Sequence, residues 1–179
     1  MSALRRCLIA FVLLPGFHAT GAASPPEDAA LQLASVMRLD FAVLDSLQWH
    51  TRRSALQGQV PMAAYECLTR QDAARLTPSI AQHLAAHLSD ADIRAALAFF
   101  SSPLGRKFTE ASLVNAHQRF DPTVKEPMPE FSYEDMSAAT AFFESAEGRK
   151  LQRLFPPSPP ATQRLAEQML AECQAPAPR

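Results

Sequence analysis

Glycine is scarce in this sequence. The 179-residue chain contains five glycines, and only Gly58, Gly105 and Gly148 lie beyond residue 23. Loops that cradle phosphate groups need clustered glycines, so three isolated ones exclude a dinucleotide-binding fingerprint and a P-loop. The sequence also has no G-x-S-x-G segment and no Cys-x-x-Cys pair. These absences exclude the nucleophile elbow of α/β hydrolases and thioredoxin-like redox chemistry.

Long apolar runs and an excess of one charge are missing too. Beyond the N-terminal segment, the strongest apolar stretch runs only from Ala95 to Phe100, whereas a membrane-spanning helix needs about 20 residues. The net charge of the whole chain is −1, which offers no basic surface to nucleic acid or to an anionic membrane. We therefore expect no nucleic-acid partner and no membrane span in the mature chain.

The N-terminus is typical of a secretory signal peptide. Arg5 and Arg6 precede an apolar run at residues 8–14, which a Pro15-Gly16 break and small residues up to Ala23 follow. We predict export to the periplasm, or secretion, after cleavage near Ala23. An uncleaved membrane anchor is the alternative, although Pro15 ends the run well before about 20 residues. Loss of residues 1–23 removes two arginines and no acid, so the mature chain would carry a net charge of −3.

Cysteine is rare, and two of the three cysteines lie beyond the predicted signal peptide. In an oxidising compartment the pair Cys67 and Cys173 is first interpreted as a disulfide. Closing a loop of about 100 residues would add up to ~4.7 kcal/mol of stability by chain entropy. Two separate buried thiols are the alternative. If paired, the cysteines attach the last helix to an early one.

Alanine, leucine, glutamine and arginine dominate the remaining chain, and no alternating run of β-branched residues is long enough for a strand. We predict an all-α fold, a small multi-helix bundle. Residues 24–174 would form a single helical domain. It would begin with one helix that starts after Pro26 and runs towards Arg53. It would also contain two pseudo-repeats, a proline-rich spacer and a C-terminal helix, at about 89–120, 132–155, 156–160 and 161–174. Residues 175–179 are predicted to be a disordered tail.

An internal repeat is the most specific feature of the sequence. A shift of 43 residues aligns DIRAALAFFSSPLGRKF, at 92–108, with DMSAATAFFESAEGRKL, at 135–151, and ten of the seventeen positions are identical. The pattern predicts a helix, a break capped by serine and a second helix entered through glycine. The residues expected to have structural roles are Phe99, Phe100, Ser102, Pro103 and Gly105 in the first unit, and Phe142, Phe143, Ser145 and Gly148 in the second.

Each part of the repeat suggests a packing role. Phe100 and Phe143 would continue the core face, whereas Phe99 and Phe142 point away from it and need a second neighbour or line an open groove. The missing Cβ at Gly105 and Gly148 would allow a close approach. The pairs Arg106-Lys107 and Arg149-Lys150 are interpreted as solvated surface, with a pair of anion sites as the alternative.

The first repeat unit resembles a known bacterial family. The stretch from Leu76 to Glu110, with LSDADIRAALAFFSSPLGRKF at its centre, resembles domain of unknown function twenty fifty-nine (DUF2059). The family's pattern is matched by Phe99, Phe100, Ser102, Pro103, Gly105 and Arg106, although Phe100 stands where tyrosine is common. Ala146 replaces the proline in the second unit, which suggests a degenerate duplicate. The resemblance implies an exported helical protein and brings no known activity.

We find no catalytic set and no cofactor site in the sequence. His83 and His87 are four residues apart and share a helix face, so they are candidate metal ligands. Leu84 occupies the place of the glutamate in H-E-x-x-H, and two histidines near a helix C-terminus are the competing interpretation. His50 and His117 are expected at the surface, and Trp49 in the core or as an anchor at its edge.

These observations favour a non-enzymatic protein over an enzyme. We expect an exported helical protein that binds an envelope protein or another envelope component through a groove between its repeats. A metal-dependent hydrolase or metal-binding protein that uses His83 and His87 is the alternative. A structural or stress-response protein without a ligand is a third possibility.

Overall fold

The computed structural model describes residues 26–121, 123, 125–154 and 160–175. In these ranges the chain forms nine α-helices and one short 3₁₀ helix, η1, and no strand, as the sequence predicted. The elements in chain order are α1 (Pro26–Val36), α2 (Leu39–Leu56), α3 (Met62–Leu68), η1 (Ala73–Leu76), α4 (Thr77–His87), α5 (Asp90–Ser101), α6 (Pro103–Phe120), α7 (Tyr133–Glu144), α8 (Ala146–Gln152) and α9 (Pro160–Gln174). The predicted signal peptide, the spacer up to residue 159 and the tail from residue 176 lie outside the described residues.

The predicted first helix is wrong in one respect, because it consists of two helices. Between α1 and α2 the chain turns at Arg38, which adopts the left-handed conformation with φ 51°. Non-glycine residues rarely adopt this conformation. The Arg38 guanidinium lies 4.4 Å from the centre of the Phe41 ring, a cation–π contact that holds the turn. Asp40 then accepts hydrogen bonds from the Phe41 backbone and from Thr77 at the start of α4.

Serine side chains begin the four helices of the repeats. Ser89 and Asp92 form a capping box at α5, and Ser132 and Asp135 form the same box at α7. Each box satisfies backbone N–H groups that a helix start leaves unpaired. Ser102 and Ser145 cap α6 and α8 in turn by accepting the N–H of the glycine three residues later.

The hydrophobic core lies where α1 packs against α4 and α5. Leu33, Leu84 and Ile93 are almost completely buried there. The same cluster continues to Leu68 on α3 and Met169 on α9. These two helices pack against each other, and the Sγ atoms of Cys67 and Cys173 lie 2.03 Å apart, at disulfide distance.

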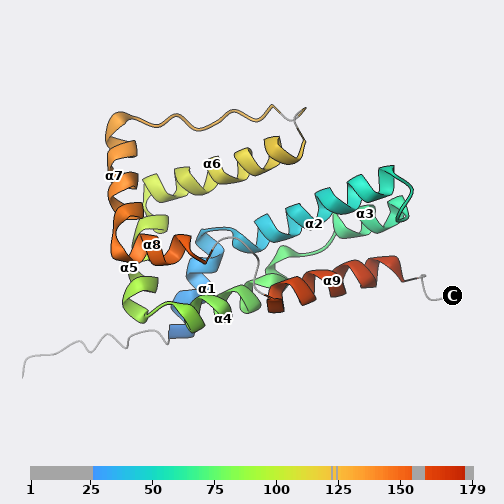
Figure 1. The fold of residues 1–179 in the computed structure, drawn as a ribbon, viewed down its shortest axis with the longest axis horizontal. Coiled ribbons are helices and arrows are strands. Elements are labelled where there is room, and N and C mark those ends of the chain that lie inside the picture. Colours follow the sequence, from blue (N-terminus) through green and yellow to red (C-terminus); the bar gives the residue numbers. More distant parts are fainter. Residues whose placement is uncertain (1–25, 122, 124, 155–159, 176–179) are drawn as a thin grey trace, which may run out of the picture.

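Figure 1 shows how the two repeats sit relative to this core. Helices α7 and α8 lie at one end of the molecule, and α3 and the C-terminal part of α9 lie at the other end. The segment that joins α6 to α7 runs back along the outside of α6. The second repeat also reaches the core, because Leu151 of α8 is buried in the same cluster.

Candidate functional site

The two repeat units pack against each other through equivalent residues. The rings of Phe99 and Phe142 stack with centroids 4.0 Å apart and an angle of 3° between their planes. Phe99 also meets the edge of Phe143, and Phe142 the edge of Phe100. A contact in which each residue meets its own counterpart is the signature of two-fold symmetry. Phe99 and Phe142 therefore cover each other and do not line an open groove.

Two exchanged ion pairs follow the same symmetry. Lys107 of the first unit lies 2.6 Å from the carboxylate of Asp135 in the second. Lys150 of the second unit lies 2.8 Å from the carboxylate of Asp92 in the first. Each acid belongs to a capping box, so each unit's lysine completes the helix start of the other unit. These bonds lower the pKa of both carboxyls, that of Asp92 to about 2, with the Lys150 hydrogen bond as the largest cause.

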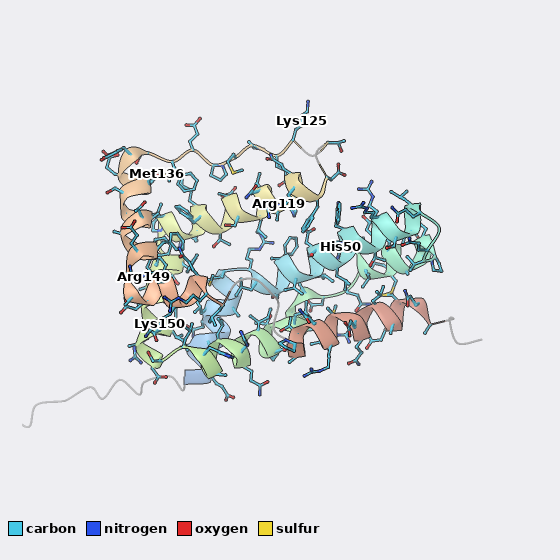
Figure 2. The ribbon with its side chains drawn as sticks, in the orientation of Figure 1. His50, Arg119, Lys125, Met136, Arg149 and Lys150 are labelled. Carbon is cyan, nitrogen blue, oxygen red and sulfur yellow. A yellow bond between two sulfur atoms is a disulfide. The ribbon has the colours of Figure 1, made fainter. Side chains whose placement is uncertain are left out.

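Within the two Arg-Lys pairs, the lysines and the arginines make different contacts. Lys107 and Lys150 each bond to a carboxylate of the protein. Arg106 donates a hydrogen bond to the backbone carbonyl of Ser101. Arg149 is exposed at the surface of α8, where Figure 2 labels it beside Lys150. The two lysines therefore join the repeats, whereas the two arginines do not contact the other unit's capping acids.

The symmetry of the repeats ends at their outer faces. The outer face of α5 packs against α1 and α4, and Ile93 on it is 1% exposed. The equivalent residue on α7 is Met136, which is 48% exposed and is labelled in Figure 2. Tyr133, one turn earlier on α7, is 85% exposed. Among the described elements α7 packs mainly against α6 and α8, so its outer face lacks the helix that covers α5.

A groove between the repeats lies beside this face. It has a volume of about 420 Å³ and is lined by Pro103, Leu104 and Lys107 on α6, with Asp135 across from them on α7. This groove differs from the predicted one, because the starts of α6 and α7 line it and the phenylalanines do not. The Lys107–Asp135 ion pair is part of its lining.

The candidate metal ligands His83 and His87 lie side by side on α4. Their ring centroids are 4.2 Å apart, and Nδ1 of His87 lies 2.9 Å from the backbone oxygen of His83. Burial, and to a smaller extent the neighbouring His87, lower the pKa of His83. No group of three histidine, cysteine or acidic side chains is placed to hold a metal ion within the described ranges. Within the described residues, His83 and His87 therefore have no third side chain placed to complete a metal site.

A second pocket lies between α2, α3 and α6, on residues that the sequence did not bring together. Its volume is about 150 Å³, and Asp45, Trp49, Tyr65, His117 and Phe120 contribute to its walls. His117 is not a free surface histidine, because Nε2 lies 3.3 Å from Asp45 and Nδ1 lies 3.1 Å from Glu126. Sequence spacing could reveal such a cluster only if its members were close together in the chain. Here the partners come from α2, α6 and the segment after α6, so only the tertiary structure shows it.

The fold and the packed repeats define an all-α protein built around two paired helix-turn-helix units. The family described as "Uncharacterized protein conserved in bacteria (DUF2059)" matches residues 74–121, which confirms the resemblance. The matched range spans α4, α5 and α6 and ends before the second unit. No curated protein and no solved structure matches the chain. None of the helices that the structure describes is both long enough and apolar enough to cross a membrane.

Proposed function

We propose that this chain is an exported, non-enzymatic binding protein that holds an amphipathic helix of another envelope protein against the outer face of α7. The exposed face of α7, with Tyr133 and Met136, is the observation that carries the proposal. Soluble proteins rarely leave neighbouring large apolar side chains in contact with water unless another surface covers them.

The chain itself provides the template for the partner. On the first repeat the equivalent face is covered by α1, whose buried residues are Ala30, Leu33 and Ala34. A stripe of small residues with one leucine lets two helices approach closely. We therefore expect a partner helix with a similar stripe to pack on Met136, the equivalent of Ile93.

Charge adds a second feature to the expected partner. Glu134 and Glu144 lie exposed at the two ends of α7. Lysine or arginine residues on both sides of the partner's apolar stripe would complement these acids. Charges at the rim of an interface contribute to specificity and to the association rate more than to affinity.

A cross-linking experiment tests the α7 site. A photoreactive amino acid is placed at Met136 in the full chain expressed in its bacterial host, and at Met128 as the control. Met128 is also an exposed methionine, 45% accessible, but it lies in the segment before α7. We expect an adduct from position 136 and none from 128, with the linked peptide forming an amphipathic helix. Equal labelling at both positions, or no adduct at either, would contradict the proposal.

The isolated partner peptide then gives the affinity. Fluorescence anisotropy should show that Met136→Glu weakens binding of the labelled peptide at least tenfold, while Met128→Glu leaves it unchanged. An adduct to a second copy of this chain, with a dimer in light scattering, would assign the face to self-association instead.

The export part of the proposal has its own measurement. Intact mass and N-terminal sequencing of protein from the periplasmic fraction should give a chain that begins at Ser24. A chain that retains residues 1–23 and remains with the membrane would support the alternative of an uncleaved anchor.

A further inference from the structure

The pocket between α2, α3 and α6 is separate from the proposed α7 face, and none of its lining residues belongs to the repeat motif. Its volume of about 150 Å³ equals that of about five water molecules at ~30 Å³ each. A site of this size can hold a small molecule, but it is too small for the surface of another protein.

Aromatic rings form one wall of the pocket. Trp49 and Phe120 stack with centroids 5.0 Å apart and an angle of 28° between the planes. Tyr65 of α3 contributes a third ring to the lining. The faces of aromatic rings carry negative potential and attract cations, and tryptophan does so most strongly. The Arg53 guanidinium, 5.7 Å from the Trp49 ring centre, already uses this property.

Charged groups form the other wall, where Asp45, Asp121 and Arg52 line the pocket and Glu126 lies just outside the lining. Arg52 pairs with Asp121 at 3.1 Å and neutralises it. Asp45 and Glu126 share a single partner, since His117 lies between them.

The environment of Asp45 indicates the same deficit of positive charge. Burial is the main influence on this carboxyl and raises its pKa, and the nearby Glu126 raises it further, while His117 opposes them. A positive group within the pocket would favour the ionised form of Asp45, because opposite charges at short range stabilise each other.

We propose that this pocket binds a small organic cation, a quaternary or primary ammonium about the size of choline. The ammonium group would lie among the aromatic side chains that line the pocket, Trp49, Tyr65 and Phe120, and face the carboxylate of Asp45. Aromatic faces and one carboxylate together favour an ammonium over a neutral or anionic ligand of the same size.

The chain contains a direct reporter for this site. Trp49 is its single tryptophan, so intrinsic fluorescence follows the pocket without a label. Titration with choline or tetramethylammonium should give a saturable change in emission. The neutral isostere 3,3-dimethylbutanol and inorganic phosphate should give none. Equal binding of the neutral isostere, or no saturable change with either cation, would overturn the proposal.

Variants separate the pocket from general effects on the fold. Asp45→Asn should weaken choline binding at least tenfold, whereas Asp90→Asn, an exposed aspartate at the start of α5, should leave the affinity unchanged. Phe120→Leu, which keeps an apolar side chain, should also weaken binding, and circular dichroism checks that each variant remains helical. Unchanged affinity in both Asp45→Asn and Phe120→Leu would refute the site. The α7 proposal is unaffected by either result, because its variants lie on another helix.

Discussion

Phe99 and Gly105 meet where α5 turns into α6. A Cβ at Gly105 would overlap the carbonyl oxygen of Phe99 and the Cα of Phe100, both backbone atoms that cannot turn aside. Gly148 meets Phe142 and Phe143 in the same way. The two glycines therefore let each turn close tightly, which in turn places Phe99 and Phe142 for their stack.

Gly105→Ala tests this close approach. Alanine favours a helix by about 1 kcal/mol over glycine, but the clash with backbone should cost more, so we expect a net loss of ~1–3 kcal/mol. Urea unfolding followed by circular dichroism measures the difference. Ser112→Ala, at an exposed position in the same helix α6, is the control and should remain within about 0.5 kcal/mol of the unmodified protein. A Gly105→Ala protein as stable as the original would refute the packing role.

At the scale of helices, most features that depend on neighbouring residues in the chain could be predicted from the sequence. The caps at Ser89, Ser102, Ser132 and Ser145 depend on residues within three positions, so all four helix starts could be predicted. The turn at Arg38 could not, because neither glycine nor proline marks it and a contact with Phe41 holds it. The exchange of lysines between repeats was missed for a related reason. Lys107 and Asp135 meet only when two units pack face to face.

Asp92 makes the start of α5 sensitive to acid. Lys150 and Ser89 lower its pKa from an ordinary value of 3.8 to about 2 in the folded protein. A carboxyl with a lowered folded pKa stabilises the fold above its unfolded pKa, and this stability is lost as the pH falls towards the folded pKa. We expect the free energy of unfolding to fall between about pH 5 and pH 2.

Asp92→Asn should remove this part of the pH dependence. At pH 7 it should cost ~1–3 kcal/mol, since hydrogen bonds to a charged and buried partner are lost. Asp135→Asn is the matched control in the second repeat, where the side chain is 28% exposed against 5% for Asp92. The control should cost less. Urea unfolding at pH 7, 5 and 3 measures both, and parallel pH curves for the Asp92→Asn and unmodified proteins would contradict the assignment.

At the scale of the whole molecule, the bond between Cys67 and Cys173 closes a loop with a sequence separation of 106. It ties α9 to α3, at the end of the molecule away from the second repeat. Arg75 of η1 and Glu172 of α9 form an ion pair near this link at 3.0 Å. The C-terminal helix is thus attached by the disulfide, by packing through Met169 and by surface charge.

Reduction of the disulfide should therefore destabilise the protein. Removal of a native disulfide of this loop length costs about 2–5 kcal/mol, because the unfolded chain gains freedom. Urea unfolding with and without dithiothreitol measures the loss. The double variant Cys67→Ser/Cys173→Ser should show the same lower stability and no response to dithiothreitol. An unmodified protein that does not respond either would mean that the two thiols are separate.

Because the two repeats lie within one chain, the contact between them needs less binding free energy than a contact between separate chains. Two such units on separate chains would have to associate from dilute solution. A short connection of the kind between α6 and α7 raises their effective concentration to the millimolar range, and binding at 1 mM corresponds to only about 4 kcal/mol. Covalent linkage thus lets the second unit tolerate Thr140 where the first has Leu97, and Ala146 where the first has Pro103. The second unit is also the one whose outer face, with Tyr133 and Met136, stays exposed.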